Sequence, residues 1–325
     1  MNLPKKVKER PPVVPERAVK PMLSVRIWGS RGSIPCPGRD TVVYGGNTSC
    51  LEIRADEKLV IIDFGTGVKP LGDWLVANDL KRGAIEADIF ITHTHWDHIM
   101  GFPMFTPLFI PSSRLRIRGP VSYEDETLAE IIGSQLTYRY WPVRISELSA
   151  RIEYAQIKET SLDLGEGLWV TTKYLNHPIL CLGYRFEYRG KSIVTAYDNE
   201  PFRNLFPTDP GDPSYDEDAA REGEAAAREE NEKLLRFFQG ADVLIHDSQY
   251  TAGEYSKHLG WGHSSFEHAI NAANKAGAKK LVLFHHDPNR TDAELEILEG
   301  DYRKRIADKT PMQVVMAREG ARIEA

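Results

Sequence analysis

Four potential metal ligands stand within six residues of one another in the first third of the chain. His93, His95, Asp97 and His98 form the pattern H-x-H-x-D-H, directly after an apolar run that ends at Ile91. Imidazole nitrogens and carboxylate oxygens suit zinc and neighbouring first-row ions. In a tight loop, His93 and His95 can face one ion while Asp97 and His98 reach a second. The spacing therefore predicts a two-metal site.

An ordinary structural role explains this cluster less well. A lone histidine beside an apolar strand is usually only a hydrogen-bonded polar residue. Three histidines and an aspartate gain nothing from packing, however, and burying them unpaired would cost on the order of several kcal/mol. We therefore interpret the cluster as metal ligands.

Three later polar residues also follow apolar runs. His177, Asp198 and His285 each stand at the end of a predicted strand, as the 93–98 cluster does. Residues that end neighbouring strands can lie on one rim of a sheet sandwich. We therefore expect these remote residues to meet the first cluster.

The elements that must position these residues follow from hydrophobic periodicity and from turn residues. Strands are predicted at 23–29, 48–54, 59–63, 87–91, 115–119, 151–157, 168–174, 181–188, 191–197, 241–245, 280–284, 313–316 and 321–323. Helices are predicted at 68–80, 124–136, 216–238, 266–276 and 292–306, and residues 99–109 are expected to be a buried helix or wall. This order suits two packed sheets covered by helices, in one domain over residues 23–325. Residues 1–22, with five prolines, are expected to be a disordered or loosely draped tail.

Composition narrows the classes of function. The chain has 325 residues, 41% of them hydrophobic, and its net charge of −6 argues against a general nucleic-acid binder. Three cysteines predict no disulfide framework and favour a reducing compartment, so a cytoplasmic location is expected. No apolar run is long enough to span a bilayer, and the N-terminus lacks the apolar segment of a secretory signal.

The H-x-H-x-D-H cluster resembles the signature of the metallo-β-lactamase fold superfamily. Within it, the chain is similar to the tRNA 3′-processing endonucleases called ribonuclease Z and to related small phosphodiesterases. Beyond the cluster, the likeness is carried by Gly29-Ser30-Arg31-Gly32-Ser33-Ile34-Pro35, Asp63-Phe64-Gly65, Gly183-Tyr184-Arg185, His246-Asp247 and Gly262-His263-Ser264. The resemblance implies an α/β (α+β) fold, the four-layer αββα sandwich.

The resemblance also implies a dinuclear ligand set. His93, His95 and His177 would hold one divalent ion, Asp97, His98 and His285 the other, and Asp198 would bridge them. Zinc suits these ligands best, although manganese or iron could occupy the same positions.

The same resemblance assigns catalytic roles. His263 would donate a proton beside the metals, Asp247 would orient that histidine, and Asp97 counts as catalytic as well as a ligand. A water molecule between two cations can lose its proton near neutral pH and attack as a bridging hydroxide. A positioned acid adds roughly a hundredfold or more when the leaving group is an alkoxide. Asp63 would support the metal loop through backbone N–H groups, or would merely cap its strand.

One departure from the family pattern bears on the substrate. Resemblance to bacterial ribonuclease Z would imply a long arm that grips tRNA, placed between the later histidine and the bridging aspartate. Here only twenty residues separate His177 from Asp198, which leaves no room for such an arm. The insertion lies instead between Asp198 and Asp247, and its acidic helix would repel a polyanion. We therefore expect a phosphodiesterase for a small or cyclic nucleotide, with no stable nucleic-acid partner and no membrane partner.

Four alternatives remain. The chain could be a tRNA 3′-processing endonuclease, a lactone, thioester or β-lactam hydrolase, a non-catalytic binding module, or a di-iron redox protein.

The family suggests a homodimer, with residues 99–109 and the helix at Glu124 as candidate surfaces. Tyr138, Tyr140 and Trp141 are expected in the core rather than in a pocket, and His286 is expected to point away from the site. His258 and His268 are interpreted as solvated.

Overall fold

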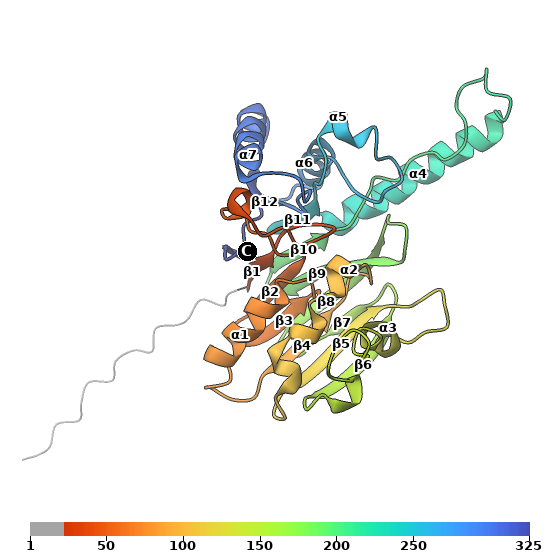
Figure 1. Cartoon of the computed structure of the whole chain (residues 1–325). Coiled ribbons are helices and arrows are strands. Elements are labelled where there is room, and N and C mark those ends of the chain that lie inside the picture. The colour runs from red at the N-terminus through yellow and green to blue at the C-terminus, as the bar shows by residue number, and fades with distance from the viewer. Residues whose placement is uncertain (1–22) are drawn as a thin grey trace, which may run out of the picture.

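Two seven-stranded mixed sheets pack face to face in this computed structural model, which describes residues 23–325 (Figure 1). The predicted tail at residues 1–22 lies outside the described residues. Helices cover the outer faces of both sheets, so the layers run helix, sheet, sheet, helix (Figure 1). The predicted four-layer αββα sandwich is confirmed.

The first sheet contains the strands of the N-terminal half and one strand from the C-terminal end. Its order is β14-β1-β2-β3-β4-β5-β6, and the run from β3 to β6 is parallel. Its strands are β1 (Leu23–Gly29), β2 (Cys50–Ala55), β3 (Lys58–Ile62), β4 (Glu86–Phe90), β5 (Arg114–Pro120), β6 (Arg151–Ile157) and β14 (Arg322–Glu324).

The second sheet is built from the remaining strands. Its order is β13-β12-β11-β10-β9-β8-β7, and the run from β10 to β13 is parallel. Its strands are β7 (Ser161–Asp163), β8 (Leu168–Leu175), β9 (Cys181–Tyr188), β10 (Lys191–Ala196), β11 (Val243–Asp247), β12 (Lys280–Phe284) and β13 (Gln313–Met316). Strand β7 is absent from the sequence prediction.

The helices are α1 (Val68–Asn78), α2 (Trp96–Ile99), α3 (Leu128–Gly133), α4 (Glu217–Phe238), α5 (Ala252–Tyr255), α6 (Phe266–Lys275) and α7 (Asp292–Ile306). Short 3-10 turns lie at Arg39–Thr41, Phe102–Met104, Thr106–Phe109 and Ile145–Glu147. Among the described residues, none of the helices combines the length and apolar character needed to cross a bilayer.

Three apolar layers stabilise the sandwich. The central layer lies between the sheets and contains buried residues such as Ile53, Phe90 and Phe186. The second layer lies between the second sheet and helices α4, α6 and α7, and the third lies between the first sheet and α1, the 3-10 turns and α3. Removing such apolar side chains from water is the dominant favourable contribution to folding.

Three local predictions need correction. The predicted helix at 124–136 is only α3, because a capping box at Thr127 starts it late and it ends at Gly133. Residues 99–109 form two 3-10 turns after α2, each with a proline in its first two positions, in place of a helix. Phe102 and Phe105 are buried, as in the expected wall, whereas Met104 and Phe109 are exposed. Tyr138 and Tyr140, expected in the core, are 57% and 73% exposed.

Helix α4 projects from the body of the molecule (Figure 1). Its C-terminal end packs through Leu234, Phe237 and Phe238, all buried. Its first turns are mostly exposed and are acidic, with Asp216 capping the helix through the backbone N–H of Ala219. The insertion between Asp198 and Asp247 is therefore an acidic extension anchored at one end.

Candidate functional site

Strands that run in the same direction bring their carboxyl ends to one edge of the sandwich. Residues that follow or end these strands carry most of the predicted site. They are Asp63 after β3, His93 after β4, His177 after β8, Asp198 after β10, Asp247 at the end of β11 and His285 after β12. The topology thus brings together the residues that the sequence prediction expected to meet.

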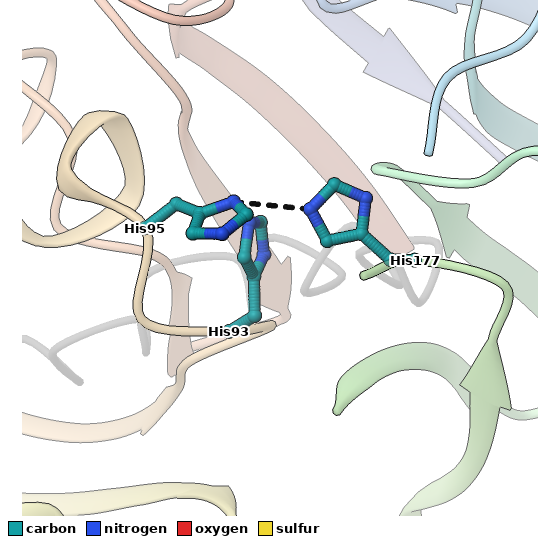
Figure 2. Close-up of side chains that lie close together, drawn as sticks. All are labelled: His93, His95 and His177. Carbon is teal, nitrogen blue, oxygen red and sulfur yellow. Dashed lines mark hydrogen bonds between the residues drawn. The ribbon is translucent and has the colours of Figure 1, made fainter. Parts of the chain in front are cut away.

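Three histidines form the first group of donors. The ring nitrogens Nδ1 of His95 and Nε2 of His177 lie 3.0 Å apart, and the ring of His93 lies 4.6 Å from both of the other rings (Figure 2). One donor nitrogen from each residue lies within 4.8 Å of the other two. The group has the size and chemistry of a three-histidine metal site.

Two aspartates and two histidines form the second group, from Asp97, His98, Asp198 and His285. His285 Nε2 lies 3.2 Å from Asp97 Oδ2 and 3.1 Å from Asp198 Oδ1, and His98 Nε2 lies 3.2 Å from Asp97 Oδ2. Asp198 Oδ2 also lies 3.6 Å from His93 Nε2 in the first group. Asp198 therefore touches both groups, as the predicted bridging role requires.

The donor atoms are arranged to bind cations rather than to form hydrogen bonds with one another. His93 Nε2, His98 Nε2 and Asp198 Oδ1 are buried and have no hydrogen-bond partner among residues 23–325. Buried polar atoms are normally satisfied, so orphans that converge on one point indicate an ion that satisfies them. The two groups are therefore suited to hold divalent ions.

The charges around the second group support the same conclusion. Burial would raise the pKa of Asp97, but the nearby His98 and His285 hold it well below its usual range. Burial would lower the pKa of His98, yet Asp97, Asp198 and Asp63 raise it well above its usual range. The carboxylates of Asp97 and Asp198 thus stay ionised although they are buried, and two buried carboxylates favour a cation between them. In the first group burial lowers the pKa of His93, which favours the neutral, ligating form of its ring.

Short backbone features hold the 93–98 loop. His95 has an extended backbone, and α2 begins at the next residue, so Asp97 and His98 lie on a single helical turn. The N–H of Ser33 donates to Asp97 Oδ2 at 2.7 Å. A side chain at Gly32 would place its Cβ 2.2 Å from the ring of His285, so only glycine fits there.

Asp63 supports the loop through side chains as well as backbone. Its carboxylate accepts hydrogen bonds from the Thr92 N–H at 2.7 Å, from the Thr92 hydroxyl at 2.8 Å and from His98 Nδ1 at 2.8 Å. The bond to Nδ1 directs Nε2 of His98 toward Asp97 and Asp198. Such carboxylate–histidine pairs orient ligating imidazoles.

His263 lies beside both groups of donors. Its Nδ1 donates to Asp247 Oδ2 at 2.7 Å, and its ring stacks 4.8 Å from that of His285. Burial would lower the pKa of His263, but Asp247 and Asp198 raise it to about 9. The imidazole is thus held in one orientation and is protonated at neutral pH, as a proton donor requires.

Sequence reasoning missed three residues that orient the site. Thr92 donates its hydroxyl to Asp63, Gln249 accepts from His285 Nδ1 at 3.0 Å, and Glu200 accepts from the backbone before His263. Thr92 and Glu200 are close in sequence to predicted ligands, which is the one signal that could have marked them. Nothing in the pattern around Gln249 indicates its contact.

The remaining histidines lie outside the donor groups. His286 points away, as expected, and its Nε2 donates to the carbonyl of Ala317 at 2.9 Å. His258 is half-buried and stacks on Tyr250 at 4.4 Å. His268 is also half-buried, with its ring 5.9 Å from that of buried His246, so both are only partly solvated.

Comparison with known proteins gives one family match and many relatives. The model of the metallo-beta-lactamase superfamily matches residues 43–178. Ribonuclease Z from Lactococcus lactis subsp. lactis (strain IL1403) is 30% identical over 233 residues, which cover 61% of this chain and 69% of that protein. The residues matched by the family model include the 93–98 cluster and the first group of histidines.

Solved structures resemble the whole described fold. The metallo-beta-lactamase fold protein YhfI from Bacillus subtilis has a TM-score of 0.61 at 18% identity and covers 94% of this chain and 100% of its own. A diphosphatase from the PhnP family has a TM-score of 0.59 at 16% identity, with 93% and 98% covered. At these identities the likeness concerns the fold alone.

Proposed function

Because the chain belongs to the metallo-beta-lactamase superfamily, in the branch that contains ribonuclease Z, we propose that it hydrolyses phosphodiester bonds. It is a metal-dependent hydrolase. The observation that carries the phosphodiester proposal is the position of His263, which is fixed by Asp247 next to the two groups of metal-ligating residues. An oriented acid is most useful where the leaving group is a poor one, such as an alkoxide.

The residues of this chain would share the work as follows. His93, His95 and His177 would hold one ion, Asp97, His98 and His285 the second, and Asp198 would touch both. Two divalent ions bound there would activate water and offset the negative charge that grows on the phosphoryl oxygens.

The proton donor belongs to the chain itself. His263 would donate its proton to the departing oxygen, while Asp247 holds its ring through Nδ1 and so leaves Nε2 for the substrate. We propose zinc as the ion, since histidine and carboxylate ligands suit it.

The comparisons favour an RNA substrate over the small nucleotide expected from the sequence. Ribonuclease Z is the relative found at about 30% identity, so tRNA 3′-end processing is the activity that the relatives support best. We therefore place cleavage of an RNA 3′ extension first.

One observation keeps a small nucleotide as the second candidate. Strands β9 and β10 form a hairpin that takes up almost the whole interval between His177 and Asp198, so no arm extends from that interval. The extension that the chain does have, α4, begins with acidic residues Asp216, Glu217 and Asp218 and offers little attraction to a polyanion.

The test compares substrates under defined metal conditions. Chelator-treated protein is reloaded with Zn²⁺, Mn²⁺ or Co²⁺ and given bis-p-nitrophenyl phosphate, a precursor tRNA with a 3′ trailer, a cyclic nucleotide panel and a lactone. We expect metal-dependent cleavage of bis-p-nitrophenyl phosphate and of at least one nucleotide substrate. Metal-dependent turnover of the lactone alone, unaffected by His263→Ala, would refute phosphodiester hydrolysis.

The three cysteines of the chain, Cys36, Cys50 and Cys181, are free. Free thiols are typical of a reducing compartment, and we propose a cytoplasmic location on that basis.

A further inference from the structure

Glu200 lies two residues after the candidate bridging ligand Asp198 and is only 3% exposed. Its carboxylate accepts three hydrogen bonds, one from the end of α5 and two from the loop that follows. Oε1 accepts from the Tyr255 hydroxyl at 3.0 Å and from the N–H of Gly260 at 2.9 Å, and Oε2 accepts from the N–H of Gly262 at 2.8 Å. Both oxygens of this buried carboxylate accept hydrogen bonds. Charge-assisted hydrogen bonds are about twice as strong as neutral ones, so they constrain the loop strongly.

The loop that Glu200 holds touches both halves of the site. The carbonyl of Gly262 accepts from His177 Nδ1 at 3.0 Å, and the next residue is His263. Gly262 has φ of +86°, and a Cβ there would lie 2.2 Å from His177 Nδ1. The backbone at Gly262 is therefore pressed against the imidazole of a candidate ligand in a conformation that favours glycine.

The orientation of His177 follows from this contact. With Nδ1 donating to the Gly262 carbonyl, Nε2 is left to face His95 Nδ1 at 3.0 Å, where the first group of donors converges (Figure 2). The backbone of Glu200 adds a second connection, since its N–H donates to the carbonyl of Asn176 at 2.9 Å, directly before His177. Three loops, which carry His177, Asp198 and His263, thus meet at Glu200.

We propose that Glu200 is a positioning residue that orients His177 for metal binding and places His263 for proton donation, through the single loop 260–263. The effect on metal binding stands independently of the reaction. The effect on turnover rests on the proposed phosphodiester hydrolysis.

Glu200→Gln tests the proposal with a change of one atom. Gln has one carbonyl oxygen and one NH₂ group, so at least one of the Gly260 and Gly262 N–H groups must face a donor in place of an acceptor. We expect one Zn²⁺ per chain to bind roughly 10- to 100-fold more weakly, while the second Zn²⁺ is retained. Competition with a chromophoric chelator measures both affinities.

Two controls separate positioning from general loss of structure. Glu267 also accepts a tyrosine hydroxyl, that of Tyr302 at 2.7 Å, but on the contact between α6 and α7. Glu267→Gln is therefore expected to keep both wild-type Zn²⁺ affinities. If Glu200 acts through His177, adding Glu200→Gln to His177→Ala should cause no further loss of Zn²⁺ affinity, because contacts in one chain of interactions are not additive.

The outcomes are distinct. Wild-type affinity for two Zn²⁺ ions in Glu200→Gln, or a loss that simply adds to that of His177→Ala, would overturn the proposal. If Glu200→Gln does not fold, Glu200→Asp keeps both oxygens but shortens the side chain, and undiminished binding of two ions would overturn it equally. In Glu200→Gln, excess Zn²⁺ should restore the part of kcat that was lost because the weaker site was not filled. A wild-type protein that cleaves no phosphodiester would refute the proposed function, while the Zn²⁺ titration would still decide the role of Glu200.

Discussion

Replacing Asp63 by asparagine should remove one metal ion from the site without removing a ligand. The buried carboxylate of Asp63 accepts from the Thr92 N–H, from the Thr92 hydroxyl and from His98 Nδ1, at 2.7, 2.8 and 2.8 Å. Asparagine can keep its oxygen on the Thr92 N–H, but its NH₂ group would then face Thr92 Oγ1 and His98 Nδ1. His98 can accept from that NH₂ group only by moving its proton to Nε2.

That change of tautomer determines how much metal affinity is lost. Nε2 is the atom of His98 that faces Asp97 and Asp198 at 3.2 and 3.3 Å, and a protonated Nε2 cannot ligate. Removing such a supporting carboxylate typically weakens metal binding by roughly 10- to 100-fold. One or two lost hydrogen bonds to a charged group, at about 1.5–3 kcal/mol each, should also lower the free energy of unfolding of the metal-free protein.

The assay is a Zn²⁺ titration, with Asp88→Asn as the matched control. Asp88 is also buried and also accepts three hydrogen bonds, two from Arg116 and one from Arg118, but these lie outside the donor groups. Both variants should lose stability to urea, and only Asp63→Asn should lose affinity for one ion. Equal Zn²⁺ affinities in the two variants would refute the argument that Asp63 acts through the His98 tautomer.

Three further predictions follow from individual contacts. His263→Ala should slow hydrolysis of nucleotide phosphodiesters by roughly 10²- to 10⁴-fold, but that of bis-p-nitrophenyl phosphate much less, because nitrophenolate leaves without a proton donor; kcat/KM on the two substrates measures the difference. Gly32→Ala should displace His285, since the new Cβ would lie 2.2 Å from its ring, and metal analysis should find one ion fewer than in Gly253→Ala, where the Cβ meets nothing within 4 Å. Burial and the neighbouring His246 lower the pKa of His268 from 6.5 to about 3, so the unfolded chain binds a proton there first and stability falls as pH drops from 6.5 towards 3. His268→Gln should remove about 2 kcal/mol of this loss at pH 5, seen as a flatter dependence of unfolding free energy on pH.

The ligands could be predicted from the sequence because their signal is local. His93, His95, Asp97 and His98 stand together after one strand, and His177, Asp198 and His285 each follow an apolar run. Parallel strands end at one edge of a sheet, so a correct strand assignment is enough to bring these residues near one another. That reasoning needs no knowledge of side-chain contacts.

The supporting residues could not be predicted in this way. Thr92, Glu200 and Gln249 are common polar residues, and what each one does depends on a partner far away in the sequence. The contact between Glu200 and Gly262 joins residues 62 positions apart. Only tertiary structure supplies such pairings.

The errors in the fold prediction have a similar origin. The apolar run 99–109 has the composition of a buried helix, but Pro103 and Pro107 break it into short turns. Leu136 continues the apolar spacing of the predicted helix, yet the chain leaves the helix after Gly133. Helix ends are decided by capping and by neighbouring elements, which periodicity does not report.

Strand β14 pairs with β1, with Ser24 opposite Glu324 and Arg26 opposite Arg322. During translation, β1 leaves the ribosome long before its neighbour on that side has been synthesised. The first sheet therefore keeps an open edge on the nascent chain until β14 has been made, and His285 reaches the other ligands only late. Contacts this distant in sequence slow folding, so we expect the newly made chain to gain hydrolase activity only after β12 and β14 have emerged, and to be most prone to aggregation before then.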